Sequence, residues 1–123
     1  MTDWKERQLA ACRHYGVSPV AVGPEDRVGV ARDLREAGTM PICGVRHLPE
    51  NGTCGWYIWA GEKSEAHDFF VPLHVSHLEE WCAAALPFLL LPPGWCFVVE
   101  GSEYNAWFDP TVDLSSLPTT PRA

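Results

Sequence analysis

The chain has 123 residues, of which 46% are hydrophobic and 20% are charged, a balance typical of one globular domain and unlike that of a disordered chain. The net charge of −7 is unevenly distributed: residues 1–48 contain seven Lys/Arg and six Asp/Glu, whereas residues 49–123 contain two and ten. An acidic surface repels nucleic acid and attracts basic proteins, although negative charge also simply keeps a protein soluble. The composition therefore argues against a nucleic-acid partner.

The sequence also indicates a cellular compartment. The first fourteen residues are polar and charged, without the apolar stretch of a signal peptide. The longest apolar run, residues 83–91, is interrupted by Pro87 and is far shorter than the roughly 20 residues that span a membrane. The five cysteines include no C-x-x-C pair, which argues against a disulfide framework and a zinc site. We therefore expect a cytoplasmic protein with reduced cysteines and no membrane contact.

The N-terminal residues predict one helix and two less regular segments. Asp3–His14 shows helical spacing of apolar residues, and Gly16 follows it at a position where glycine commonly ends helices. Residues 17–22 form a short β-branched stretch that contains a proline. Residues 27–37 fit either a helix or the start of a strand, and both alternatives stay open.

Clearer patterns follow in the middle of the chain. Two apolar runs, residues 42–48 and 55–60, flank a loop with Asn-Gly and predict a hairpin. Residues 68–73 predict a loop or a short extended piece. Ser76 and Glu79 match a capping box, so a helix is predicted to open at Ser76. Its buried stripe would consist of Leu78, Trp81, Cys82, Ala85 and Leu89.

The C-terminal part predicts a second hairpin. Pro92-Pro93-Gly94 ends the preceding helix, and residues 95–100 alternate as a strand requires. The chain then turns into a second strand, Asn105–Asp109.

These elements predict an α+β fold, in which an antiparallel sheet built from two hairpins carries helices packed on one face. We expect a single domain over residues 1–114, followed by a flexible, proline-rich tail over residues 115–123. Within the domain, a helical and extended part covers residues 1–40 and a core covers residues 41–110.

No motif in the sequence predicts catalysis, a cofactor or a metal. His74, His77 and Cys82 could supply three metal ligands, but their spacing differs from H-E-x-x-H and Cys82 belongs to the apolar stripe. Cys43 or Cys54 could pair with a histidine, but neither lies in a nucleophile motif. The sequence contains no P-loop, G-x-G-x-x-G or G-x-S-x-G motif. We therefore expect a protein that is not an enzyme.

One segment, GWYIWAGE at residues 55–62, combines a Gly-Trp pair with a Gly-Glu pair. Further segments accompany it: PICGVRH at 41–47, DFF at 68–70, PLHV at 72–75, HL at 77–78, LLLPPGW at 89–95 and WFD at 107–109. In this arrangement, over about residues 41–110, the chain resembles a family of bacterial immunity proteins, the thirty-third named among the immunity proteins of polymorphic toxins. The resemblance implies an α+β domain that neutralises a toxin by binding it.

The resemblance and the charge distribution together predict that the acidic half forms the partner surface. The partner would be a cognate toxin of basic character, held by aromatic anchors and attracted by charge. The expected contact residues are Trp59, Glu62, Asp68, Glu103, Tyr104, Trp107 and Asp109. Strand alternation would place Trp107 and Asp109 on one face and Phe108 on the other.

Two alternatives to toxin binding stay open. One is a domain that binds a small ligand in a tryptophan-lined pocket, since the chain contains six tryptophans. The other is a small hydrolase that uses the loop carboxylates, because paired acids can cleave glycosidic bonds.

Overall fold

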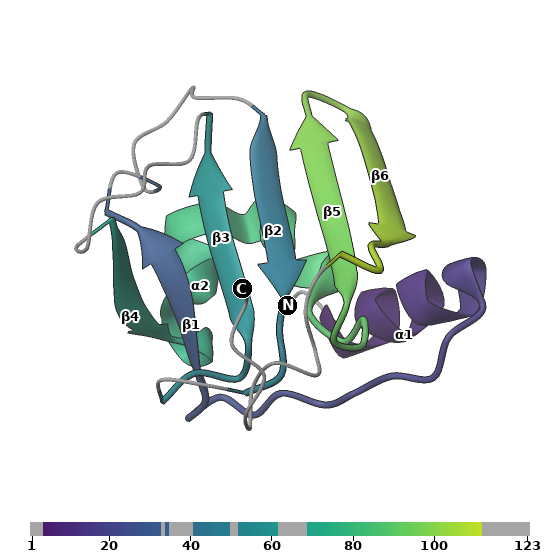
Figure 1. The fold of residues 1–123 in the computed structure, drawn as a ribbon, viewed down its shortest axis with the longest axis horizontal. Helices are drawn as coiled ribbons and strands as arrows, with labels where there is room; N and C mark the ends of the chain where they lie inside the picture. The colour runs from purple at the N-terminus through teal and green to yellow at the C-terminus, as the bar shows by residue number, and fades with distance from the viewer. Residues whose placement is uncertain (1–3, 33, 35–40, 50–51, 62–68, 112–123) are drawn as a thin grey trace.

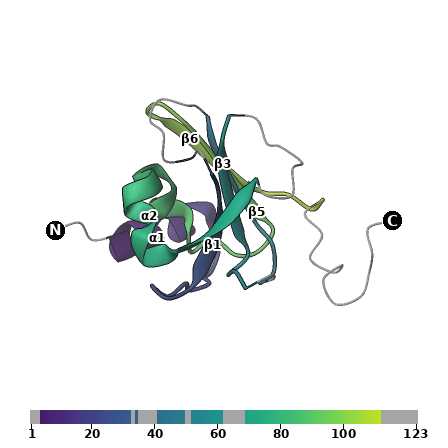
Figure 2. The ribbon, with the colours of Figure 1, turned by 90° about the vertical axis from the view of Figure 1, so that its left-hand side faces the viewer.

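The computed structural model describes residues 4–32, 34, 41–49, 52–61 and 69–111. The elements in chain order are α1 (Trp4–Tyr15), β1 (Arg27–Ala31), β2 (Ile42–Arg46), β3 (Trp56–Ala60), β4 (Phe70–His74), α2 (Val75–Cys82), the 3-10 helix η1 (Ala83–Phe88), β5 (Trp95–Glu100) and β6 (Glu103–Phe108). These strands form a six-stranded sheet in the order β4-β1-β3-β2-β5-β6. Figure 1 shows the sheet face-on, and Figure 2 shows that the helices lie on one side of it.

The α+β class is confirmed, but the expectation of a purely antiparallel sheet was wrong. β1 and β3 run parallel, with Val30 beside Ile58, whereas every other neighbouring pair is antiparallel. β1 comes from the segment that fitted both a helix and a strand. Val28, Val30 and Ala31 are all fully buried, so β1 lacks the apolar–polar alternation of a strand with one exposed face.

The centre of the sheet is held against the helices by one aromatic stack. β2 pairs antiparallel with both β3 and β5, and β5 pairs antiparallel with β6. A Cβ at Gly44 on β2 would overlap the ring of Phe97 on β5. Because Gly44 has no side chain, the Phe97 ring can lie across β2 and stack on Phe88 of η1, with ring centroids 4.7 Å apart. The stack fixes β5 beneath the helix layer.

The C-terminal end of α1 agrees with the sequence prediction, whereas the N-terminal end of α2 does not. α1 stops at Gly16, which has φ +73° and follows Tyr15, close to the expected boundary. α2 begins at Val75, and no side chain caps it, so the capping box expected at Ser76 was wrong. The free donors are satisfied from another segment: the N–H of Val75 donates to the carbonyl of Asp26 at 2.8 Å and that of Ser76 to the carbonyl of Pro24 at 3.2 Å.

The apolar stripe expected after Ser76 is buried only in part. Leu78, Ala85 and Leu89 are fully buried, whereas Trp81 and Cys82 are half-buried at its margin. The stripe runs over two kinds of helix, because α2 ends at Cys82 and the chain continues as the 3-10 helix η1. Trp81 and Cys82 lie at the end of α2, just before this change. Within the part of the chain that the structure describes, we find no helix that combines the length and apolar character needed to cross a membrane.

A buried arginine joins the sheet to three other segments. Arg46 lies on the helix side of β2 with only 2% of its surface exposed. Its Nη1 donates to the carbonyl oxygens of Val20 at 3.0 Å, Leu91 at 2.9 Å and Leu89 at 3.2 Å. Its Nε donates to the carbonyl of Cys54 at 3.4 Å. The connection after α1, the loop before β3 and the segment after η1 are therefore all oriented toward one guanidinium.

Trp56 completes the surroundings of this charge. The guanidinium carbon of Arg46 lies 5.9 Å from the centroid of the Trp56 ring, and Trp56 Nε1 donates to the carbonyl of Leu89 at 2.8 Å. Burial lowers the pKa of Arg46, while nearby Cys54, Asp26 and Cys12 act in the opposite direction. The residue keeps its charge because arginine normally titrates far above neutral pH.

We expect Arg46→Met to destabilise the protein by about 3 kcal/mol or more, because it leaves several buried carbonyl oxygens without a donor. Urea denaturation followed by circular dichroism measures this change. Arg13→Met, at an exposed position on α1, is the matched control and should change stability by less than about 0.5 kcal/mol. Equal effects of the two substitutions would show that the buried hydrogen bonds of Arg46 do not stabilise the fold.

Candidate functional site

Exposed aromatic side chains concentrate on β6. Among the described residues, four large hydrophobic side chains are exposed, and three of them lie on this strand: Tyr104 at 63%, Phe108 at 50% and Trp107 at 41%. The fourth is Val20 in the connection after α1. β6 is an edge strand of the sheet, so its outer side has no neighbouring strand. Aromatic side chains exposed on an edge strand are characteristic of a protein-binding surface.

The register with β5 fixes the direction of each aromatic residue. Tyr104 lies opposite Val99 and Phe108 opposite Trp95, on the helix side of the sheet. Trp107 lies opposite Cys96 and therefore points to the helix-free face. The aromatic groups thus flank the edge from both faces.

Carboxylates stand at both ends of β6. Glu100 and Glu103 are directly opposite each other at the hairpin turn, and both are exposed. Like charges in directly opposite positions destabilise a strand pair. At the other end, Asp109 Oδ1 accepts hydrogen bonds from the Thr111 hydroxyl at 2.6 Å and the Thr111 N–H at 2.9 Å, which lower the pKa of the Asp109 carboxyl.

No Lys, Arg or His occurs anywhere in residues 95–111, so these charges are not compensated along the hairpin. We call this set of residues the β6 surface: Glu100, Glu103, Tyr104, Trp107, Phe108 and Asp109. Its combination of negative charge and exposed aromatic area is the combination expected of a surface that binds a basic protein.

The backbone of the edge is partly covered. The N–H of Asp109 donates to the carbonyl of Gly94 at 2.9 Å, and the alternation of an antiparallel ladder then directs the backbone groups of Tyr104, Ala106 and Phe108 away from β5. The Ala106 backbone in the middle of this row faces the Tyr15 hydroxyl of α1 and acts against the rise that burial causes in the pKa of Tyr15. A strand from a partner could not pair along the full edge without displacing Tyr15, so the surface favours contact through side chains.

The structure gathers only part of the expected contact set. Glu103, Tyr104, Trp107 and Asp109 lie together on or beside β6. Trp59 is half-buried on β3, with its ring 6.2 Å from that of Phe70. It shares the helix-free face with Trp107 but lies three strand spacings away, about 14 Å. Glu62 and Asp68 fall outside the described residues.

Sequence reasoning missed two members of the β6 surface, Phe108 and Glu100. Strand alternation had placed Phe108 on the face opposite Trp107, which the register bears out. The exposure of Phe108 follows from the edge position of the strand, which no local pattern reveals.

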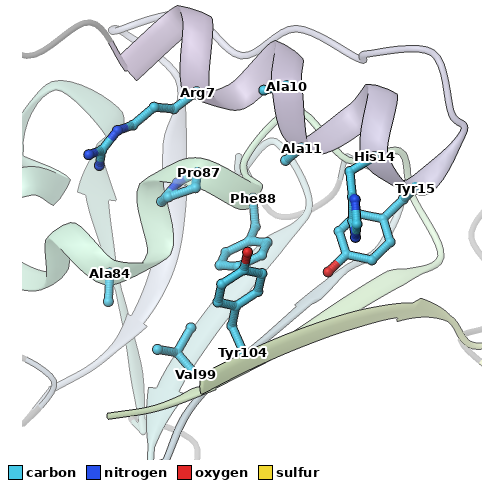
Figure 3. A pocket seen from close by; sticks show the side chains of 10 residues that line it. All are labelled: Arg7, Ala10, Ala11, His14, Tyr15, Ala84, Pro87, Phe88, Val99 and Tyr104. Atoms are coloured by element: carbon cyan, nitrogen blue, oxygen red, sulfur yellow. The ribbon is translucent and has the colours of Figure 1, made fainter. Parts of the chain in front are cut away.

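A pocket of about 590 Å³ opens beside this surface, between α1, η1 and the β5–β6 pair (Figure 3). Its aromatic lining consists of Tyr15, Phe88 and Tyr104. None of its lining residues is a tryptophan, so it is not the tryptophan-lined pocket that the ligand-binding alternative expects.

The residues considered for metal binding and catalysis are differently placed. The rings of His74 and His77 have centroids 6.3 Å apart, and the described residues contain no group of three or more His, Cys, Asp or Glu side chains arranged for a metal ion. Cys43 and Cys54 are unpaired thiols, and burial raises the pKa of both. A raised pKa reduces the thiolate fraction and makes each a poor nucleophile.

Comparison with known families adds to this geometry. The profile of an immunity-protein domain matches residues 7–109, from the first turn of α1 to the end of β6. The chain belongs to the family described as the Imm33-like domain. The resemblance seen in the sequence is therefore confirmed, and the match begins well before residue 41. An immunity family implies a toxin as partner and suggests a non-enzymatic role. No curated protein and no solved structure matches the chain significantly.

Proposed function

We propose that this protein neutralises a cognate toxin by binding it directly, and that the β6 surface forms the contact. The proposal rests above all on the three exposed aromatic side chains of one edge strand. Membership of an immunity-protein family supports a toxin as the partner. The protein would act in the cytoplasm by occupying the toxin rather than by modifying it.

The aromatic residues supply the affinity. Trp107 and Tyr104 present large, rigid side chains, which lose little conformational entropy when they become buried in an interface. The strand that carries them is paired with β5, and β5 is fixed in turn by the Phe97–Phe88 stack. The surface is therefore ordered before a partner arrives, which lowers the cost of binding.

The carboxylates supply steering and charge complementarity. Glu100 and Glu103 repel each other in the free protein because they are directly opposite on adjacent strands. A Lys or Arg of the toxin placed between them would turn this repulsion into attraction. The toxin is accordingly proposed to present a basic surface, as enzymes that act on nucleic acids often do.

The direct test is co-purification with a candidate toxin, chosen from the products of neighbouring genes. We expect a stable complex whose affinity falls as salt is raised, because exposed charges are screened. A neighbouring product that is not bound, at low or at high salt, would contradict the proposal.

Trp107→Ala should speed dissociation of the toxin at least about tenfold, equivalent to about 1.4 kcal/mol, because buried aromatic anchors act mainly on the dissociation rate. Surface plasmon resonance measures the two rate constants separately. Val20→Ala is the matched control, since it shortens an exposed apolar side chain outside the β6 surface.

The Trp107→Ala protein should keep its circular dichroism spectrum, because 41% of this side chain is exposed in the free protein. An unfolded spectrum would assign Trp107 to the core and remove it from the binding surface. A folded variant with unchanged dissociation would remove it equally.

The double substitution Glu100→Gln and Glu103→Gln should slow association several-fold and flatten its salt dependence, while the free protein becomes no less stable because a like-charge pair is lost. Glu79→Gln with Glu80→Gln, two exposed carboxylates on α2, gives the same net charge and should change association less. If both double variants slow association equally, net charge rather than the β6 surface steers the encounter.

A further inference from the structure

The pocket beside the β6 surface exists because α1 presents small residues to the sheet. The side of α1 that lines it carries Arg7, Ala10, Ala11 and His14, at the spacing of one helix face. The larger buried residue of this helix, Gln8, is directed to η1 instead, where its Nε2 donates to the carbonyl of Leu86 at 2.9 Å. With two alanines in the middle of the facing stripe, α1 cannot fill the space above β5 and β6.

The other walls of the pocket are apolar and firmly held. Phe88 is stacked on Phe97 in the core, and its ring centroid lies 5.9 Å from that of Tyr104. Val99 lies directly opposite Tyr104 on the paired strand and completes the floor. A volume of about 590 Å³ lies within the usual range of small-molecule sites, and such sites are largely pre-formed.

The polar side chains of the lining can each donate a hydrogen bond, and one of them, Arg7, carries a positive charge. They are Arg7 and His14 on α1 and the hydroxyls of Tyr15 and Tyr104, and the lining contains no carboxylate although the chain has a net charge of −7. Figure 3 shows the oxygens of Tyr15 and Tyr104 directed into the space between α1 and β6. Burial raises the pKa of Tyr15, and the neighbouring Tyr104 adds to this effect, so Tyr15 stays protonated and can donate.

We propose that this pocket binds a small monocarboxylate with an apolar body, such as an aryl or short alkyl acid. The apolar walls accommodate the body, the hydroxyls of Tyr15 and Tyr104 bind the carboxylate, and the charge of Arg7, which lies over the Trp4 ring at the other end of the lining, favours an anion. Arg7 would repel a cationic ligand, and a purely apolar ligand would leave the hydrogen-bond donors of the lining without an acceptor. The site is distinct from the contact with the toxin, although Tyr104 borders both.

The first test compares two probes of the same shape. Purified full-length protein is titrated by calorimetry with 4-phenylbutyrate and with 4-phenylbutan-1-ol, which lacks the charge. We expect one molecule of the acid to bind per chain, at least about tenfold more tightly than the alcohol. Equal affinity for the two probes, or no binding of the acid at millimolar concentration, would overturn the proposal. No toxin is present, so this result is independent of the proposed function.

Variants then locate the site. Ala11→Phe should abolish binding of 4-phenylbutyrate by filling the pocket. Arg7→Ala and His14→Ala alter exposed positions, and each should weaken binding of 4-phenylbutyrate several-fold without changing the affinity for the alcohol. These two variants therefore test the site even if Ala11→Phe fails to fold. Arg13→Ala removes an exposed charge from α1 outside the lining and should leave binding unchanged. The assignment is refuted if a folded Ala11→Phe protein binds the acid normally. It is refuted equally if both single variants, Arg7→Ala and His14→Ala, bind the acid normally, because the ligand would then lie elsewhere.

Discussion

The guanidinium of Arg46 lies inside the core, and its hydrogen bonds end on backbone carbonyl oxygens of Val20, Cys54, Leu89 and Leu91. Because an unsolvated charge is very costly, the segments that supply these carbonyls must keep their positions for the fold to be stable. The backbone of the same residue also acts on the C-terminal part, since the Gly94 N–H donates to the Arg46 carbonyl at 2.7 Å just before β5 begins. The strand pair that exposes the aromatic edge is thus positioned by a residue with almost no exposed surface of its own.

Local patterns predicted the elements whose determinants are local. α1 has its own apolar spacing and its terminal glycine, and β2, β3 and β5 have apolar runs bounded by turn residues. β1 could not be assigned, because a five-residue strand buried on both faces carries no periodicity. The start of α2 was misplaced for a different reason. Its donors are satisfied by carbonyls some fifty residues earlier in the chain, at Pro24 and Asp26, and a capping rule considers only neighbouring residues.

The candidate surface shows the same division between local and tertiary information. The sequence identified the acidic and aromatic character of the C-terminal hairpin, but it could not show which tryptophans are buried and which are exposed. Trp56 is fully buried, Trp59 is half-buried and Trp107 is exposed, although all three occur in short aromatic strands. The strand order separates Trp107 from the other two, because it puts β3 inside the sheet and β6 at its edge. Trp56 and Trp59, both on β3, differ because Trp56 faces the helices and Trp59 the helix-free face. The strand order depends on pairings between distant segments, and it leaves the aromatic side chains of β6 exposed.

The insertion of β1 between β3 and β4 constrains when the chain can fold during its synthesis. Gly29 pairs with Tyr57 and Arg27 with His74, so the first strand to leave the ribosome has no partner until β3 has been made, and no second partner until β4 has followed. Ribosomes add about 5–20 residues per second, so Val28 and Val30 stay exposed for seconds in the growing chain. The carbonyl groups of Leu89 and Leu91, which accept hydrogen bonds from Arg46, are added to the chain later still. A chain that stops before Leu89 lacks two of the carbonyl groups that accept hydrogen bonds from Arg46, so the core around this arginine can close only after Leu89 and Leu91 have been added.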